Sequence, residues 1–143
     1  MRKVVLDTNI LASGAISSTG TVSTIVDAWR SAQFSVIVSA PILEELERTF
    51  QKPYFRRYLS AAQSSRFLKL LRKRATVSQI TVSVHGIATH PEDDLILATA
   101  VSAKADYLVT GDTKLQHVGT YQAVAILSPR RFLEILKHEV SEE

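Results

Sequence analysis

Short apolar runs alternate with longer amphipathic segments along this chain. Four runs rich in Val, Ile and Leu lack alternating polar positions, as is typical of parallel strands covered on both faces; they span 3–8, 34–39, 106–112 and 123–128. Apolar residues spaced three or four apart predict helices over 21–32, 40–50, 53–74, 91–105, 113–118 and 129–139. Residues 78–84 fit either a strand or an extended loop.

This order of elements predicts the fold class. Strands alternating with helices favour an α/β fold, a three-layer α/β/α sandwich with a central, mainly parallel sheet. The chain has no internal repeat and no linker, and its 143 residues are enough for one core, so we expect a single domain over 1–143. We expect residues 138–143 to be a frayed C-terminal tail.

Acidic residues recur where the predicted strands end. In an open parallel sheet, ligands bind outside the carboxyl ends of the strands. The acids placed there by the predicted topology are Asp7, Glu44, Glu45, Asp93, Asp94 and Asp112. Each alone has an ordinary explanation, as a helix cap, a favourable charge in a first helical turn or a solvated side chain. Together they would repel one another unless a cation neutralised them, which indicates a divalent-cation site.

Helix geometry favours one member of each acidic pair. At about 100° per residue, Glu45 borders the apolar stripe of its helix, whereas Glu44 points more fully to solvent. Asp93 falls between Ile96 and Leu97 at helical spacing, on the buried side. Asp94 is not excluded as the direct ligand.

Composition narrows the kind of cation. The chain has no cysteine, and His85, His90, His117 and His138 show no metal-ligand spacing, so carboxylates and a hard ion, Mg²⁺ or Mn²⁺, are indicated.

No signal-peptide pattern and no apolar run of about 18 residues is present, so we expect a cytoplasmic protein without a membrane span. The net charge of +3 permits a polyanionic partner without singling one out.

Four motifs, spread over nearly the whole chain, resemble those of the PIN-domain ribonucleases, including the toxins of VapBC-type toxin–antitoxin modules. They are VVLDTNIL, VSAPILEEL, PEDDLILATA and DYLVTGD. In the second motif, a Glu follows the strand-ending Ser39 by six residues and falls on Glu45. Aligned on the ATA helix, the third acid falls on Asp93, while Thr110 and Asp112 match a final Thr-x-Asp.

The resemblance implies endonucleolytic cleavage of RNA that depends on Mg²⁺ or Mn²⁺. The implied catalytic and metal-binding residues are Asp7, Glu45, Asp93 and Asp112, acting directly or through water. Polar residues implied to orient these ligands or their waters are Asn9, Ser39 and Thr110. The resemblance further implies an RNA substrate, a cognate antitoxin protein, and assembly into a homodimer or higher homo-oligomer.

RNA contacts would need positive charge around the acidic centre. Arg66, Lys69 and Lys73 share one helix face, and Arg56 and Arg57 are interleaved with aromatic residues that could stack on bases. The opposing interpretation, slightly favoured, is that these are solvated helix faces and that the aromatic residues are core or dimer contacts.

Three other functions stay open at this point. A PIN domain that binds RNA or a protein without cutting is disfavoured by the intact acidic set. A haloacid-dehalogenase-like phosphatase needs a second Asp two residues after the first, where this chain has Asn9. A response-regulator receiver needs further acids beside the first strand's end, where VVLDTN offers one.

Overall fold

The computed structural model describes residues 1–142, with side chains up to Glu139. A six-stranded sheet lies at its centre in the order β3-β2-β1-β4-β6-β5, and every neighbouring pair is parallel except β5 with β6. The strands are β1 Lys3–Leu6, β2 Ser35–Val38, β3 Thr76–Val77, β4 Tyr107–Val109, β5 Thr120–Tyr121 and β6 Val124–Leu127. The predicted mainly parallel sheet is confirmed.

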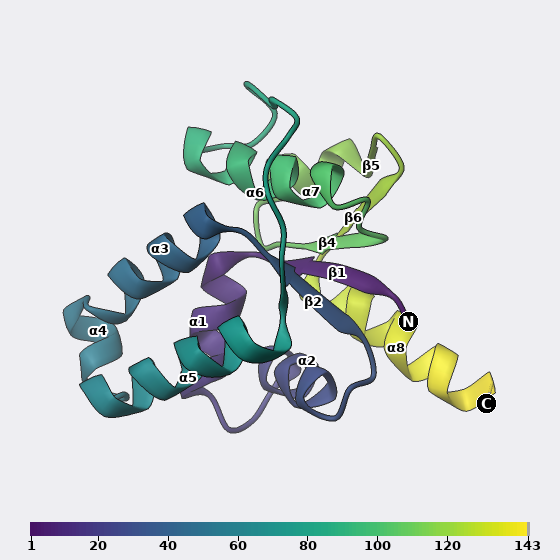
Figure 1. Ribbon diagram of the computed structural model, residues 1–143. Coiled ribbons are helices and arrows are strands. Elements are labelled where there is room, and N and C mark those ends of the chain that lie inside the picture. Colours follow the sequence, from purple (N-terminus) through teal and green to yellow (C-terminus); the bar gives the residue numbers. More distant parts are fainter. Residues whose placement is uncertain (143) are drawn as a thin grey trace.

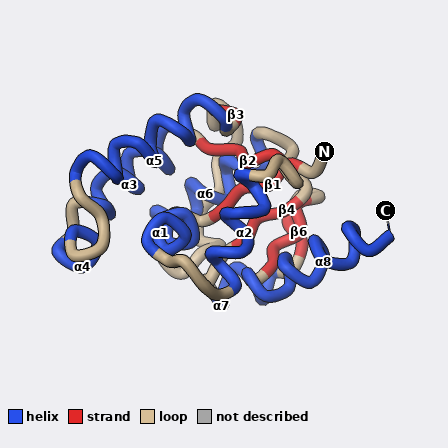
Figure 2. Tube along the Cα trace, turned by 90° about the horizontal axis from the view of Figure 1, so that it is seen from below, coloured by secondary structure: helices blue, strands red, loops and turns tan. Residues whose placement is uncertain are grey.

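Helices cover both faces of the sheet, as the α/β/α prediction requires. They are α1 Thr8–Ile16, α2 Thr21–Arg30, α3 Ala40–Phe50, α4 Pro53–Arg56, α5 Ala61–Arg74, α6 Pro91–Ser102, α7 Thr113–Val118 and α8 Pro129–Glu142. In Figure 1, α6 and α7 lie above the sheet, and α1, α2 and α8 lie below it. Helices α3, α4 and α5 form an arm that extends away from the sheet, as Figure 2 also shows from below. In the described part of the chain, no helix is both long and apolar enough to cross a bilayer.

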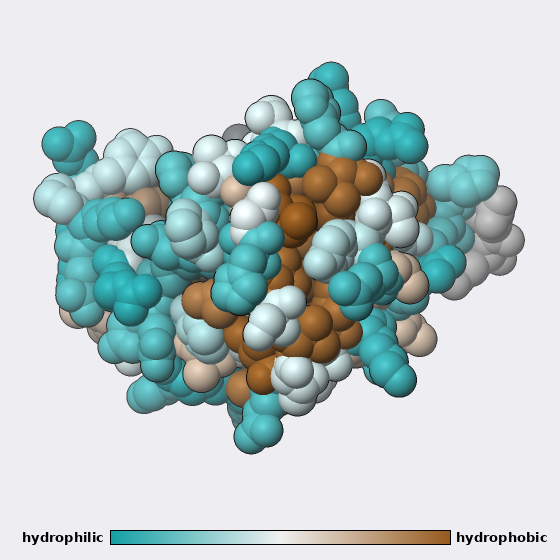
Figure 3. All heavy atoms as spheres, turned by 90° about the horizontal axis from the view of Figure 1, so that it is seen from above, coloured by the Kyte–Doolittle hydropathy of each residue, from teal (hydrophilic) through white to brown (hydrophobic). Residues whose placement is uncertain are grey.

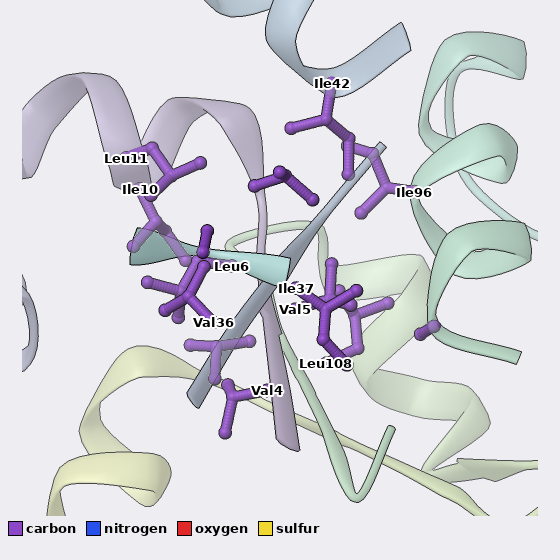
Figure 4. Packing of buried hydrophobic residues seen from close by; sticks show 14 of the residues in the cluster. Val4, Val5, Leu6, Ile10, Leu11, Val36, Ile37, Ile42, Ile96 and Leu108 are labelled. Atoms are coloured by element: carbon purple, nitrogen blue, oxygen red, sulfur yellow. The ribbon is translucent and has the colours of Figure 1, made fainter. Parts of the chain in front are cut away.

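The core fills both sides of the sheet because its strands are apolar at every position. Val4, Val5 and Leu6 are fully buried. Val4 and Leu6 point to the face of α1, while Val5 points the opposite way together with its register partners Ile37 and Leu108 (Figure 4). Successive strand residues thus find separate apolar partners, which explains the absence of polar alternation.

The structure differs from the predicted elements in the connections. The helix predicted over 53–74 is two helices. The Ser60 hydroxyl accepts from the Gln63 N–H, and the Gln63 side chain accepts from the Ser60 N–H. This capping box starts a new helix at Ala61. Residues 78–84 form an extended loop. Helix α1 and strand β5 were not predicted, because their sequences show no clear helical or strand periodicity. Helix α8 runs to Glu142 through most of the predicted frayed tail at 138–143, and Glu143 lies outside the described residues.

Gly14 sets the approach of α1 to α2. A Cβ atom at this position would overlap the Cγ2 atom of Val26, and Gly14 is itself buried. We expect Gly14→Ala to lower the free energy of unfolding by about 1–3 kcal/mol, the usual cost of overpacking, in spite of alanine's better helix propensity. Urea denaturation measures this effect. Gly111→Ala, at a position with open space around the glycine, is the control and should change the stability much less.

Candidate active site

Asp7 lies at the junction of the two central strands. The register pairs Leu6 with Val109, so Asp7 comes next to Thr110, and the Asp7 N–H continues the ladder to the Val109 carbonyl at 2.9 Å. The Asp7 carboxylate is 5% exposed. Its Oδ2 accepts a 2.7 Å hydrogen bond from the Thr110 hydroxyl, and its Oδ1 caps α1 by accepting from the Asn9 N–H at 3.3 Å. The buried strand therefore ends on an acid that neighbouring polar groups hold in place.

Thr110 connects Asp7 to Asp112. The Thr110 hydroxyl donates to Asp7 and accepts from the Asp112 N–H at 3.0 Å. The Asp112 carboxylate caps α7 through the N–H groups of Lys114 and Leu115. It also accepts from both the N–H and the hydroxyl of Thr89, at 3.0 and 2.8 Å. Both strand-end acids are thus fixed by helix caps as well as by a shared threonine.

Glu45 reaches the same region from α3. Its Oε2 accepts a hydrogen bond from the Thr8 hydroxyl at 3.3 Å, and Thr8 adjoins Asp7. Glu45 is half-buried and Glu44 is exposed, in agreement with the helix geometry expected for this pair. Glu45 lies on the wall of a neighbouring pocket that also contains Glu92.

Asp93 and Asp94 have different surroundings. Asp94 is 6% exposed, and its two oxygens accept from the backbone N–H groups of Gly86, Ile87 and Ala88 at 2.7–3.1 Å. Those bonds hold the loop before α6. Asp93 is half-buried and lines the cleft with Asp7 and Asp112. Asp93 therefore lies with the other acids at the cleft, whereas Asp94 binds the backbone of the loop.

Burial and mutual repulsion perturb the pKa values of these acids. The pKa of Asp93 rises to about 6, first through burial and then through the charges of Asp7, Glu45 and Asp112. Burial also raises the pKa of Asp7 and of Glu45, against the hydrogen bonds from Thr110 and Thr8. For Asp112, burial raises the pKa, but the hydrogen bonds from Thr89, Leu115 and Lys114 outweigh it and hold the pKa below its ordinary value. Carboxylates from four separate segments thus act on one another.

A cleft of about 460 Å³ opens over three of these acids. It is lined by Asp7, Asn9, Ile10, Ser13, Val22, Thr89, His90, Asp93, Gly111, Asp112 and Thr113. It lies where the chain passes from β1 to β2 on one side and to β4 on the other, which is the switch point that favours ligands. A larger, mainly apolar pocket of about 550 Å³ between α2 and α8 holds one acid, Asp27, and is unrelated to this set.

Two contributors to the site were not identified from the sequence. Thr89 holds the Asp112 carboxylate with two hydrogen bonds, and His90 is the N-cap residue of α6 and lines the cleft, without a side-chain hydrogen bond to the helix. In the sequence, both stand directly before PEDD, the first turn of α6. Without the topology, nothing shows that this helix begins opposite Asp112.

Ser39 lies behind the site. Its hydroxyl is 2.8 Å from that of Thr99, which itself donates to the Leu95 carbonyl, so Ser39 is the donor to Thr99. Ser39 is 1% exposed. This hydrogen bond joins the end of β2 to α6, the helix that carries Asp93, so Ser39 helps to position that helix. The Ser39 hydroxyl itself contacts no acid of the cleft.

The residues expected to contact RNA lie outside the cleft. Arg56, Arg57, Lys69 and Lys73 are exposed on the arm, and Arg66 lines a small groove between α1 and α5. None of them contacts a cleft acid. The basic residues and the acidic centre therefore occupy different parts of the surface.

The donor set fits a hard divalent cation. The cleft supplies carboxylate oxygens with raised pKa values, and it has no thiolate. Among residues 1–139, whose side chains the structure describes, no three acidic or histidine side chains form a ready-made metal cluster. Mg²⁺ commonly keeps several waters and binds through one or two carboxylates, which suits acids spread around a cleft.

The raised pKa of Asp93 gives a pH-dependent response to metal. Its pKa of about 6 lies above the ordinary value of 3.8, so the folded protein binds the proton more tightly and metal-free stability falls as pH rises from about 4 to 6. A cation would relieve the repulsion between the ionised acids. We expect Mn²⁺ to raise Tm more at pH 7.5 than at pH 5, measured by scanning fluorimetry. An equal rise at both pH values, or the same rise in Asp93→Asn, would contradict this.

Comparisons with known proteins agree with the fold. A sequence profile of the PIN domain matches residues 3–114. The fold is similar to a chain in the crystal structure of VapBC2 from Rickettsia felis bound to a DNA fragment from its promoter, with TM-score 0.60 and 15% identity over 87% of this chain and 96% of that one. It is also similar to a chain of FitAcB from Neisseria gonorrhoeae, with TM-score 0.55 and 19% identity over 88% and 97%. No curated protein matches the sequence. The chain belongs to the PIN domain family.

Proposed function

We propose that this protein is a divalent-metal-dependent endoribonuclease. The observation that carries the proposal is the electrostatic coupling of Asp7, Glu45, Asp93 and Asp112 at a cleft on the carboxyl edge of the sheet. Burial and neighbouring charges raise the pKa of Asp7, Glu45 and Asp93, so these acids in their ionised form destabilise the metal-free protein, which is typical of a functional site rather than of a structural one. PIN domains are generally nucleases, and this chain retains the acidic set of the family resemblance.

The residues of the cleft have separable parts in that reaction. Mg²⁺ or Mn²⁺ held here would polarise the phosphodiester and lower the pKa of an attacking water. Asp7 would be the central ligand, because the Thr110 hydroxyl fixes one of its oxygens and the Asn9 N–H of helix α1 fixes the other. Asp112, held by Thr89, and Asp93 would face the same ion across the cleft, and Glu45 would add negative charge from the neighbouring pocket. We expect products with a 5′-phosphate and a 3′-hydroxyl.

The test is incubation with single-stranded RNA and DNA of the same sequence, in Mg²⁺, Mn²⁺ or EDTA. We expect cleavage of RNA with either metal and none in EDTA, with the ends identified by their reactivity to kinase and phosphatase. Release of phosphate from a small monoester would instead indicate a phosphatase. No cleavage of any substrate would favour the alternative, a PIN domain that binds RNA or a protein without cutting.

We further propose that the protein is the toxin of a toxin–antitoxin module, acting in the cytoplasm and paired with an antitoxin. The similarity to chains of VapBC2 and FitAcB supports this. Further support comes from the face seen in Figure 3, which shows a band of apolar residues. Among the residues of α6 and α7, Leu95 and Val118 are 44% and 39% exposed. Exposed apolar bands often mark protein-binding surfaces.

Expression in a bacterial host tests the toxin proposal. Growth should stop with the natural chain, continue with Asp7→Asn, and recover when the product of an adjacent small reading frame is co-expressed. Light scattering of the purified protein tests the proposed homodimer or higher homo-oligomer. Unimpaired growth with active enzyme present would rule out the toxin role and leave the nuclease proposal standing.

A further inference from the structure

The charges of the chain are divided between residues 48–91, which include α4 and α5 of the arm, and the rest of the molecule. Residues 48–91 contain nine Lys and Arg and no acid, whereas the remaining residues contain eight Lys and Arg and fourteen Asp and Glu. The nine are Arg48, Lys52, Arg56, Arg57, Arg66, Lys69, Arg72, Lys73 and Arg74. The overall charge of +3 therefore conceals a basic outer part of the arm, from the end of α3 onward, beside an acidic remainder.

Most cations of the arm face solvent. Arg74 donates to the Arg30 carbonyl and lies over the Trp29 ring, and so has a structural role. The others from residue 52 onward are exposed and form no ion pair with any acid of the described chain: Lys52, Arg56, Arg57, Arg66, Lys69, Arg72 and Lys73. In Figure 3, the end of the molecule that carries the arm is covered with hydrophilic side chains. Such uncompensated charge suits a polyanion.

Two aromatic side chains stand among these cations. Tyr54 and Tyr58 are 55% and 56% exposed, and their ring centroids are 5.4 Å apart. Phe55 anchors this turn by packing against Phe50, with ring centroids 6.2 Å apart. The two tyrosines are therefore held at the surface without being part of the core. Exposed rings beside arginines are typical of proteins that stack unpaired bases and contact the backbone phosphates.

A row of charge continues from this tip along α5. Arg66, Lys69 and Lys73 lie three and four residues apart, on the exposed side opposite Phe67 and Leu71, and span about 10 Å. The arm begins at α3, the helix that carries Glu45. In Figure 1, α3 leaves the sheet beside the start of α1. There Glu45 of α3 accepts a hydrogen bond from Thr8, the first residue of α1. The arm is therefore joined to the side of the site at which Glu45 lies.

We propose that the surface formed by Tyr54, Arg56, Arg57, Tyr58, Arg66, Lys69 and Lys73 binds single-stranded RNA on one side of the cleavage site. The arginines and lysines contact phosphates, and the two tyrosines stack on unpaired bases, which excludes a continuous duplex at the tip. That the nucleic acid is RNA rests on the proposed function. Self-association through this face is disfavoured, because a symmetric dimer would place like charges against one another.

Binding is measured by fluorescence anisotropy with a labelled single-stranded RNA in EDTA, so that it does not depend on cleavage. We expect Tyr54→Ala with Tyr58→Ala to weaken binding at least about fivefold, and Tyr54→Phe with Tyr58→Phe to leave it unchanged, since stacking needs only the rings. Arg56→Ala with Arg57→Ala should weaken binding. The slope of log affinity against log salt concentration should also become shallower, by about 0.7 for each phosphate that is no longer neutralised. The control is Arg130→Ala with Arg131→Ala, which removes the same charge from α8.

Each outcome bears on one proposal. Wild-type affinity in the arm variants, or an equal reduction in the α8 control, overturns the RNA surface. So does a change from dimer to monomer in the arm variants without weaker RNA binding, because the face would then be a self-association interface. RNA binding that depends on the arm in a protein that never cuts RNA keeps this inference and refutes the nuclease.

Discussion

Asp7→Asn should abolish RNA cleavage while leaving the fold intact. The asparagine can still accept from the Thr110 hydroxyl, but it removes the central charge of the cleft. We expect the rate to fall by well over about 100-fold, since even partners in the outer shell of a metal commonly account for 10–100-fold. Single-turnover cleavage with Mn²⁺ measures the rate, and the Mn²⁺-induced rise in Tm should also disappear.

Asp7→Asn should not lower the stability of the metal-free protein, although it abolishes cleavage. Burial raises the pKa of Asp7, so the ionised carboxylate destabilises the metal-free fold at neutral pH. Tm in EDTA should therefore be unchanged or higher. Asp27→Asn removes one charge from an exposed position on α2 and serves as the control, with wild-type cleavage expected. Cleavage by Asp7→Asn at the wild-type rate would refute the metal-site assignment.

Asp94→Ala should be the most damaging single change to stability. It leaves three backbone N–H groups of residues 86–88 without their carboxylate acceptor. The Ala88 N–H is buried and costs about 1–3 kcal/mol when unsatisfied, and the less buried N–H groups of Gly86 and Ile87 add smaller amounts, so we expect a reduction of about 3 kcal/mol in the free energy of unfolding. For a domain of this size, that lowers Tm by about 8 °C. Urea and thermal denaturation measure the change.

Asp93→Asn is the matched variant at the neighbouring position. The charged Asp93 is disfavoured in the fold, as its raised pKa of about 6 shows, so its removal should not lower Tm at pH 7.5 in EDTA. Cleavage should nevertheless be lost. Asp94→Ala, assayed well below its Tm, should lose part of its activity, because the loop released at residues 86–88 also carries Thr89, which holds the Asp112 carboxylate. If Asp93→Asn cut normally and Asp94→Asn did not, the two roles would be reversed.

The layers and the parallel sheet could be predicted because the strands are apolar on both faces and alternate with helices, a combination typical of a covered parallel sheet. The preference for Glu45 over Glu44 also followed from local geometry. Helix α1 was missed, because it begins directly after Asp7 and its small and apolar residues give little amphipathic contrast. The break before α5 was marked by the Ser60–Gln63 pair, a signal present in the sequence.

The support around the acids could not be predicted, because it depends on contacts between distant segments. Thr89 meets Asp112 across 23 residues, and Thr110 meets Asp7 across 103. Helical geometry predicted that Asp93 lies on the buried side of its helix. In the structure Asp94 is buried more deeply than Asp93, because the loop at 86–88 folds back over Asp94. Helical periodicity describes a helix and its core, and it carries no information about such a loop.

The hydrogen bond from Thr110 to Asp7 also bears on how the protein is made. It joins the first strand to the fourth, and a slip of one residue in their pairing would turn Thr110 to the other face of the sheet. During synthesis, β1 can pair with β2 early, but its other partner, β4, is made about 100 residues after β1. No nascent fragment that ends before Asp112 can therefore carry all four acids of the site.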